Sequence, residues 1–276
     1  MSRSWRFTDI EFVVLLSDIA ESLPEPFYYT VRTADGMKYD AQQVKAREDL
    51  RRRLDPGFAE VLQVVARPDL RVTARAWDGA DWRRTDRLTR VLGVRREDRG
   101  YLITQLPGET FWHSGDFIVT ECAALELGDR IVAALPEAEP GRLPDTVLPS
   151  RTEEEMDYSF VRSQVLDSFQ DSNVERSRYL RETAAERVGA IEIIQGQSAY
   201  GPRGRTEHEL ELRDLVDDGR YVIDDQNPPV AIGADAKRLT TMVNNRIAAV
   251  VRAIKDEEGR ANTDFGQQDW GVQRTG

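Results

Sequence analysis

The residue types that most often carry enzyme chemistry are scarce in this sequence. Two histidines and one cysteine occur among its 276 residues. His113 precedes Ser114, a pair that suggests a hydrolase, but the Gly-x-Ser-x-Gly turn that exposes a serine nucleophile is missing. We expect this pair in a loop between strands and assign it no catalytic triad. His208 belongs to a charged strand face, and Cys122 lies in an apolar strand, where a small core residue is the ordinary explanation.

Two acidic pairs offer the best case for metal or acid–base chemistry. Asp217-Asp218 and Asp224-Asp225 flank one short strand, and carboxylate oxygens are ligands for hard cations. Aspartate also commonly ends strands and begins turns, which is the simpler explanation. The sequence contains neither Cys-x-x-Cys nor His-Glu-x-x-His. We therefore expect no metal and no cofactor, with a carboxylate-based hydrolase that uses Asp224, Asp225 and Glu209 as an alternative.

Composition excludes several classes of protein. The 49 acidic residues outnumber the 38 basic ones and give a net charge of -11, which disfavours nucleic acid and anionic lipid as partners. A single cysteine allows no internal disulfide. No run approaches the roughly 18 apolar residues of a membrane helix, and the beginning, MSRSWRFTDIEF, does not resemble a signal peptide. We expect a cytoplasmic protein with reduced cysteine and no membrane insertion.

The pattern of the first half of the chain predicts helices followed by an antiparallel meander. Thr8 and Glu11 form a capping box that begins a helix. Residues 27–31 are rich in aromatic and β-branched types and are predicted to be the first strand, with a turn at Asp35-Gly36. The remaining predicted elements are helices over 41–54 and 55–65, strands over 69–79, 88–94, 101–106 and 117–123, and a closing helix over 128–135.

The second half repeats this organisation after a proline-rich linker over 136–149. The predicted elements are helices over 152–169 and 173–185, strands over 188–194, 205–216 and 220–223, a short apolar run over 230–232 and a long helix over 235–254. Steps of three and four along that helix define a buried stripe, formed by Leu239, Met242, Val243, Ile247 and Val250. Residues 255–276 lose this periodicity, and we expect them to form a disordered acidic tail.

Two pairs of segments suggest an internal repeat. Arg99-Gly100-Tyr101 precedes a strand in the first half, as the Asp218-Gly219 turn does in the second half. The segment Arg130–Leu135 is similar to Arg246–Val251. We therefore predict one domain over 1–254, made of related halves over 1–135 and 150–254. Each half would deliver strands to a shared antiparallel sheet and close with a helix, which is an α+β fold.

With little sign of catalysis, the best candidate for function is an exposed sheet face. Residues 207–215 alternate between charged and apolar side chains, so Glu207, Glu209, Glu211 and Arg213 form a continuous row on one side. Such a face of mixed charge beside a closing helix is suitable for docking a protein. A solvated sheet face without a partner explains the same residues equally well.

Two stretches of this sequence resemble the EspG family, the cytosolic chaperones of type VII secretion in mycobacteria and related actinobacteria. The first is Trp5-Arg6-Phe7-Thr8-Asp9-Ile10-Glu11-Phe12, followed by Leu23-Pro24-Glu25-Pro26. The second is the Asp217–Tyr221 run together with Gly233–Leu239 ahead of the last long helix. The resemblance extends over about residues 5–254. It rests on residues that begin and end helices and strands, and it includes no catalytic signature.

The resemblance implies a central antiparallel sheet with quasi-two-fold symmetry, flanked by helical bundles. It also implies a non-catalytic chaperone that binds the PPE subunit of a PE–PPE heterodimer at its tip, keeps the heterodimer soluble and delivers it to the type VII secretion machinery. A homodimeric structural adaptor is a further alternative. The family's binding surface points to the second-half strands and the helix over 235–254. Exposed positions on these elements give the expected client contacts: Gln195, Gln197, Glu207, Glu209, Glu211, Arg213, Lys237, Thr241 and Asn244.

Overall fold

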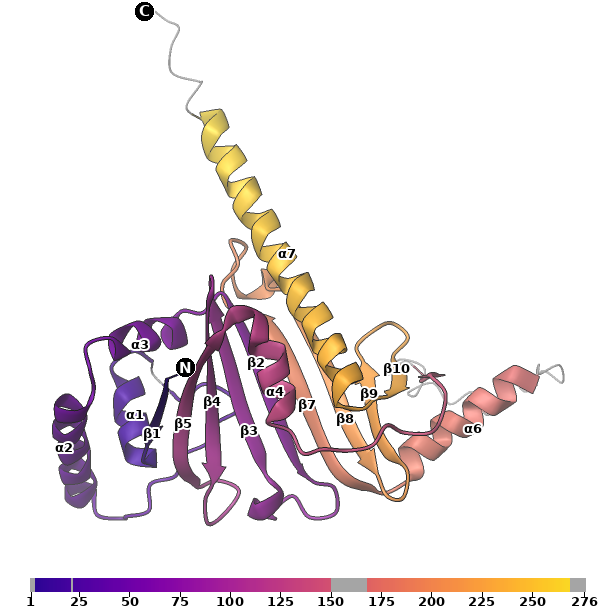
Figure 1. Ribbon diagram of the computed structural model, residues 1–276, viewed down its shortest axis with the longest axis horizontal. Helices are drawn as coiled ribbons and strands as arrows, with labels where there is room; N and C mark the ends of the chain where they lie inside the picture. Colours follow the sequence, from indigo (N-terminus) through magenta and orange to yellow (C-terminus); the bar gives the residue numbers. More distant parts are fainter. Residues whose placement is uncertain (1–2, 21, 150–167, 269–276) are drawn as a thin grey trace, which may run out of the picture.

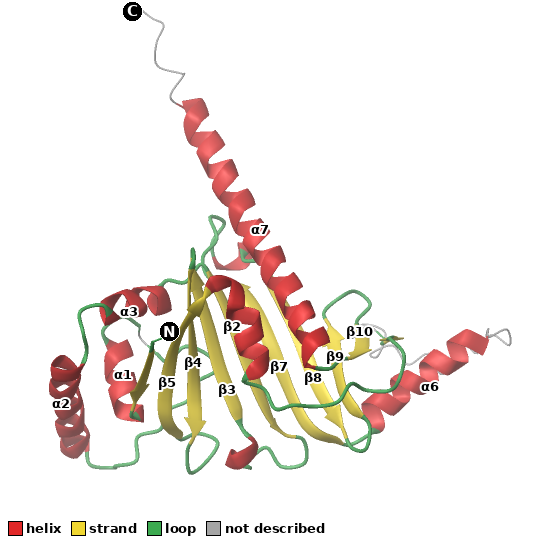
Figure 2. Cartoon of the chain, viewed as in Figure 1, coloured by secondary structure: helices red, strands yellow, loops and turns green. Residues whose placement is uncertain are grey.

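One ten-stranded antiparallel sheet organises the molecule (Figure 2). The structure, a computed structural model, describes residues 3–20, 22–149 and 168–268. In chain order the strands are β1 (Ser4–Phe7), β2 (Leu70–Asp78), β3 (Thr89–Arg96), β4 (Arg99–Pro107), β5 (Ser114–Ala123), β6 (Thr146–Val147), β7 (Ala185–Gln195), β8 (Glu207–Leu215), β9 (Gly219–Asp224) and β10 (Val230–Gly233).

The strand order shows the quasi-two-fold arrangement of the sheet. Across the sheet the order is β1-β5-β4-β3-β2-β7-β8-β9-β10-β6, so β2 and β7 are the central pair and the two halves extend outward from them. The segments Arg99–Tyr101 and Gly219–Tyr221 begin β4 and β9, which are both third from the centre. The predicted meander and the α+β fold class are therefore confirmed.

Two helices from equivalent places in the halves cover one face of the sheet. The helices α4 (Leu127–Ala133) and α7 (Ala236–Gln268) follow β5 and β10 and lie side by side (Figure 1). Leu239, Val243 and Val250 of α7 are fully buried against the sheet, and Met242 and Ile247 are partly buried there. The apolar stripe predicted for this helix is confirmed, because it meets a sheet face that is itself apolar.

Among the described residues, the elements that cover the opposite face lie at its two ends. At the first-half end, apolar side chains of α1 (Asp9–Ser17), α2 (Gly36–Arg53) and α3 (Phe58–Ala66) pack on β3, β4 and β5. At the second-half end, Leu180 of α6 (Ser168–Glu182) packs against Tyr221 and Ala231. Short 3₁₀ turns complete the described elements at Thr85–Arg87, Ala124–Glu126 and Pro202–Gly204.

The amino-terminal region differs from the prediction in two ways. Residues 27–31 form no strand, so that prediction is wrong. Phe27 instead packs edge-on against Phe12 and Phe117, while the sheet edge is taken by β1, which pairs with β5. Asp35 does not make a simple turn but caps α2, because its carboxylate accepts hydrogen bonds from the backbone of Met37 and Lys38.

The segment predicted as a linker is an ordered strap along the second half. Residues 136–149 include β6, which forms one edge of the sheet. The backbone N–H of Arg220 donates to Glu139, and its carbonyl accepts from Gly141. A β-carbon on Gly141 would lie 2.1 Å from the ring of Tyr221, so only glycine allows this close approach. Composition predicted a flexible connection here, but tertiary hydrogen bonds fix it. The helix expected over 152–169 lies, up to residue 167, outside the described residues.

Helix α7 continues well past the end predicted for it. The prediction of a disordered tail is wrong over 255–268, because these residues extend α7 without interruption and the helix rises clear of the sheet (Figure 1). Glu257 explains part of this extension, since its carboxylate accepts hydrogen bonds from Ser198 Oγ at 3.0 Å and from the Ala199 backbone at 2.9 Å. The loop between β7 and β8 thus holds the helix. Residues 269–276 lie outside the described residues.

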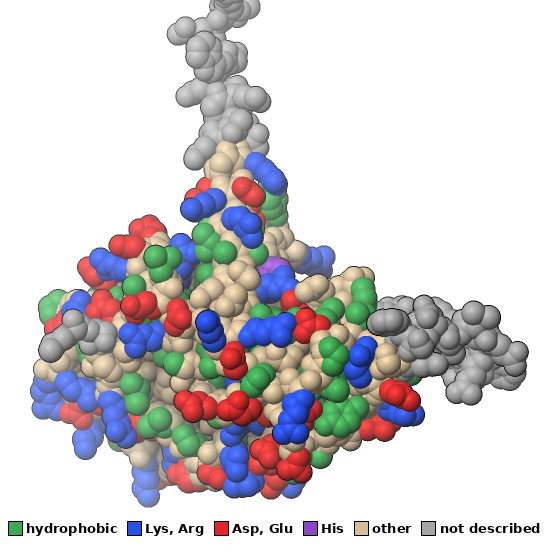
Figure 3. Space-filling model, turned by 45° about the vertical axis from the view of Figure 1, so that its right-hand side comes forward, with side chains coloured by type: hydrophobic (Ala, Val, Ile, Leu, Met, Phe, Trp, Pro, Cys, Tyr) green, Lys and Arg blue, Asp and Glu red, His purple; other side chains and the backbone are tan. Residues whose placement is uncertain are grey.

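Among the helices that the structure describes, none is both long enough and apolar enough to cross a membrane. Figure 3 shows acidic and basic side chains intermixed over the body of the molecule around α7. This distribution agrees with the mixed charge of the sequence and shows no single basic surface on that side.

Candidate functional site

The middle of the sheet, which no described helix covers on one face, is the main candidate for function. We call the face opposite α4 and α7 the open face. Strand register assigns Arg71 of β2, Ile194 of β7 and Glu207 of β8 to it, because paired residues of neighbouring antiparallel strands project to the same side. Helices α1–α3 cover one end of this face and α6 covers the other. The strands between them, β2, β7 and β8, therefore form a shallow trough.

The charged row predicted on β8 lies along this trough. Glu207, Glu209 and Glu211 are exposed and Arg213 is half-buried, while the alternate residues Leu210 and Leu212 face α7. The predicted alternation of charged and apolar side chains is confirmed for this strand. The row is acidic over three of its four positions, so a partner with basic or amide groups would complement it.

A further glutamate, on β7, lies beside this row and is itself paired with an arginine. Glu209 lies directly across from Glu192 of β7. Glu192 is in turn held by Arg75 of β2, whose guanidinium donates to its carboxylate at 2.6 Å, and by the hydroxyl of Thr73 at 3.3 Å. Charged groups thus connect all three central strands. Glu209 has no such ion pair within the described residues, so it remains available to a partner.

A groove marks the second-half end of the trough. It has a volume of about 600 Å³ and opens where α6 meets β8 and β9. Its lining combines apolar, acidic and basic side chains, among them Leu148, Leu180, Ile223, Glu209, Glu211 and Arg213. A concave site with an apolar floor and a polar rim is the usual form of a protein docking site.

An exposed aromatic cluster marks the first-half end, and the sequence analysis missed it. Tyr28, Trp82, Phe111 and Trp112 come from three separate loops and contact one another with ring centroids 5.0–6.4 Å apart. Arg90 lies within 4.4 Å of the centroids of Tyr28 and Phe111, and burial lowers its pKa to about 10. Half-exposed tryptophans of this kind are typical binding anchors. The only signal in the sequence was two tryptophans in expected turns.

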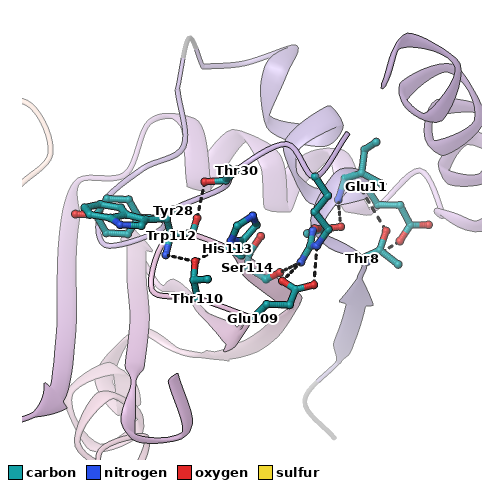
Figure 4. Close-up of polar contacts among 12 residues, drawn as sticks. Thr8, Glu11, Tyr28, Thr30, Glu109, Thr110, Trp112, His113 and Ser114 are labelled. Atoms are coloured by element: carbon teal, nitrogen blue, oxygen red, sulfur yellow. Dashed lines mark hydrogen bonds and ion pairs between the residues drawn. The ribbon is translucent and has the colours of Figure 1, made fainter. Parts of the chain in front are cut away.

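Polar contacts hold the aromatic cluster in place (Figure 4). The hydroxyl of Thr30 donates to the backbone carbonyl of Trp112 at 2.9 Å. Arg32 pairs with Asp9 and also binds both carboxylate oxygens of Glu109 at 2.9 Å. These contacts connect the loop over 22–35 to helix α1 and to the β4–β5 hairpin. The loop is therefore positioned by side chains that are far apart in the sequence.

The remaining expected contacts do not join this site. Lys237 and Thr241 are exposed on α7 and therefore lie on the other side of the sheet from the charged row. Asn244 is half-buried against α4, where a β-carbon on Gly128 would lie 2.1 Å from its Oδ1. The nine expected contacts therefore do not share one surface, because the helix and sheet positions face opposite ways. Their role in client binding stays a prediction.

The two glutamines near the end of β7 also differ from each other. Gln195 is only 1% exposed, and its amide holds the loop by donating to the Gln197 carbonyl and accepting from the Thr206 backbone. Its expected role as an exposed contact is wrong, since both of its polar atoms are used within the chain. Gln197 is exposed, as expected.

Two of the three acidic residues proposed for hydrolysis, Asp224 and Asp225, are engaged in structural contacts. Arg246 of α7 pairs with Asp224 and, at 3.2 Å, with Asp225. Burial tends to raise the pKa of Asp224, but hydrogen bonds from Gln226 and Arg246 outweigh this effect, so its pKa is lowered overall. A general acid needs a raised pKa, so Asp224 is poorly suited to that role. Asp218 is likewise occupied by the hydroxyls of Tyr179 and Tyr221.

Neither histidine is arranged for catalysis. The Nδ1 of His113 is 2.7 Å from the hydroxyl of Thr110, while Ser114 is fully buried. His208 lies 3.5 Å from Asp225. Cys122 is buried in β5, and burial raises its pKa to about 11, so the thiolate is disfavoured. Across the described parts of the chain, no group of three or more potential ligands is placed to hold a metal ion.

Comparisons with known proteins agree with this arrangement. No curated protein gives a significant match to the sequence. Thirteen chains of solved structures match, including the type VII secretion system chaperone EspG5 of Mycobacterium tuberculosis, solved in complex with a PE25–PPE41 dimer. The likeness to EspG5 has a TM-score of 0.57 at 15% identity and covers 90% of this chain and 96% of that one, so it shows a shared fold. The sequence model of the EspG family matches residues 11–245, and this chain therefore belongs to the EspG family.

Proposed function

We propose that this chain is a non-catalytic, client-specific chaperone of the cytosol. Its client would be a PE–PPE heterodimer, bound at the tip of the PPE subunit, kept soluble and delivered to a type VII secretion system. The observation that carries this proposal is membership of the EspG family, because a solved chaperone of the same fold is bound to a PE–PPE dimer.

The open face supplies a physical route to this function. It has a groove of apolar and charged side chains at one end, the aromatic cluster at the other, and the charged strands between them. An exposed apolar tip on the client would be covered by this surface, which removes it from water and from other copies of itself. Charged residues around the contact would favour the correct client over others. No bond needs to be made or broken.

Co-expression tests the proposal directly. The chain is expressed with each PE–PPE pair encoded in the same genome, and the mixtures are separated by size exclusion. We expect at least one pair to elute with the chain as a stable complex and to precipitate when the chain is omitted. If no pair forms a complex, the proposal fails. Sizing of the chain alone distinguishes it from a homodimeric adaptor.

A further inference from the structure

Two arginines on the open face have no acidic partner among the residues that the structure describes. Arg71 of β2 and Arg205, which comes just before β8, are both half-buried. Among the described residues, neither makes an ion pair, and the Nε of each is buried without a hydrogen-bond partner. A buried guanidinium without a partner is unfavourable, because it loses water and gains nothing in return.

The two side chains lie at the same end of the trough. Arg71 pairs in register with Ile194 of β7, which pairs in turn with Glu207 of β8. Arg205 precedes Glu207 by two residues. Burial lowers the pKa of Arg71 and the positive charge of Arg205 lowers it further, while the negative charge of Glu25 has a smaller raising effect. The arginines are therefore close enough to repel each other, and Glu207 forms no ion pair with either.

Several other buried arginines of the described chain do have partners. Within that part of the chain Arg213 makes no ion pair either, but it donates a hydrogen bond to the Thr183 carbonyl. Arg220 binds Asp214, Arg246 binds Asp224, and Arg75 binds Glu192. Arg90 is buried without an acid, but two aromatic rings flank it and its guanidinium donates to the Phe111 carbonyl at 2.8 Å. In a chain with eleven more acidic than basic residues, an adjacent pair of unmatched arginines is an exception.

We propose that Arg71 and Arg205 form a receptor for one carboxylate of the bound client, an aspartate or glutamate of the segment that lies across the open face. This inference rests on the proposed chaperone function and adds the chemistry of one contact to it. A carboxylate accepts two hydrogen bonds from one guanidinium and leaves lone pairs for a second. Its negative charge would relieve the repulsion between the arginines, so the favourable interaction exists only in the complex.

Affinity measurements with three matched variants test the receptor. Arg71→Gln and Arg205→Gln each remove one charge from the receptor. Arg203→Gln removes the same charge from an exposed neighbour in the same loop. With a PE–PPE pair that the wild-type chain binds, we expect the first two variants to weaken binding about tenfold or more, and Arg203→Gln by less than about threefold. Equal effects of all three variants would indicate general electrostatics and overturn the proposal.

The thermal stability of the free chain separates a receptor from a structural role. Removing one of two repelling charges should leave the Tm of Arg71→Gln unchanged or higher. A Tm that falls by several degrees, with binding lost in proportion, would show that Arg71 stabilises the fold and would overturn the proposal. Charge exchange then identifies the partner: Arg71→Glu should lose binding, and a client variant with lysine at the recognised acid should restore it.

A smaller probe keeps this inference separate from the chaperone proposal. Glutarate is titrated into the free chain at constant ionic strength, with chloride as the comparison, while the Arg Nε–H signals are followed by NMR. We expect saturable shifts for Arg71 and Arg205 and none for Arg203. If no client binds but these shifts occur, the chaperone proposal fails and the receptor stands. If glutarate acts no differently from chloride, and Arg71→Gln leaves client binding unchanged, the receptor is refuted.

Discussion

Arg220 of β9 binds Asp214 of β8 through two hydrogen bonds, from Nε at 2.7 Å and from a terminal nitrogen at 2.8 Å. Both side chains are buried. The same terminal nitrogen also donates to the backbone carbonyl of Pro136 at 2.9 Å, where the strap over 136–149 begins. One buried ion pair therefore fixes the second half of the sheet to the segment that arrives from the first half.

Arg220→Met should lower the free energy of unfolding by about 3–5 kcal/mol, because it leaves the charge of Asp214 buried with only Arg187 nearby, at 3.7 Å. Urea unfolding followed by tryptophan fluorescence measures this loss. Arg203→Met, at an exposed position, serves as the control and should change stability by less than about 0.5 kcal/mol. A loss below about 1 kcal/mol for Arg220→Met would show that the pair is not essential to the fold.

Glu257→Gln should loosen the projecting part of α7. Burial tends to raise the pKa of Glu257, but hydrogen bonds from the Ala199 backbone and the Gln195 and Ser198 side chains lower it overall. The carboxylate therefore contributes most above its ordinary pKa of 4.5 and loses this contribution as pH falls below it. Hydrogen exchange at neutral pH should become faster over 255–260 and in the β7–β8 loop of the variant.

Glu258→Gln is the matched control for this change, since it alters the next, exposed residue of the same helix. Its exchange pattern should follow the wild type. If both variants exchange alike, the loop contact does not hold the helix.

The contact between Arg32 and Glu109 should be visible in the titration of the glutamate. Hydrogen bonding to Arg32 lowers the pKa of Glu109 to about 2. Because the folded pKa is depressed, the contact is complete above the ordinary value of 4.5 and is lost as pH falls toward 2. Carboxyl NMR signals should show this low midpoint in the wild type, a midpoint near 4.5 in Arg32→Gln, and an intermediate one in Arg32→Lys. Unchanged midpoints would mean that the pair does not persist in solution.

Charge reversal can identify the face that binds the client. Glu209→Lys and Glu211→Lys alter the open face, whereas Thr241→Lys adds a charge to α7 on the other side. We expect the first two to weaken PE–PPE binding about tenfold, with little change in Tm. Glu209→Lys also removes a like-charge contact with Glu192. If only Thr241→Lys weakens binding, the client docks against α7 and the open face is not its site.

Most local elements follow from the order of residues along the chain. The capping box of Thr8 and Glu11 forms as predicted, with hydrogen bonds of 2.8 and 3.4 Å. The alternation over 207–215 and the three-and-four spacing of α7 fixed which side of each element is apolar. These features depend on neighbours within a few residues, so the chain order alone specifies them. The resemblance to the EspG family rests on the same helix caps and turns.

How those elements face one another depends on contacts between distant parts of the chain. Glu209 and Thr241 are both exposed, yet the sheet separates them. Gln195 is expected to be exposed because its side chain is polar, but the loop that leads to β8 buries it. The strap over 136–149 and the meeting of Arg71 with Arg205 likewise depend on contacts between distant segments. Such contacts are set by strand pairing and side-chain packing across the sheet, and no local pattern of residue types records them.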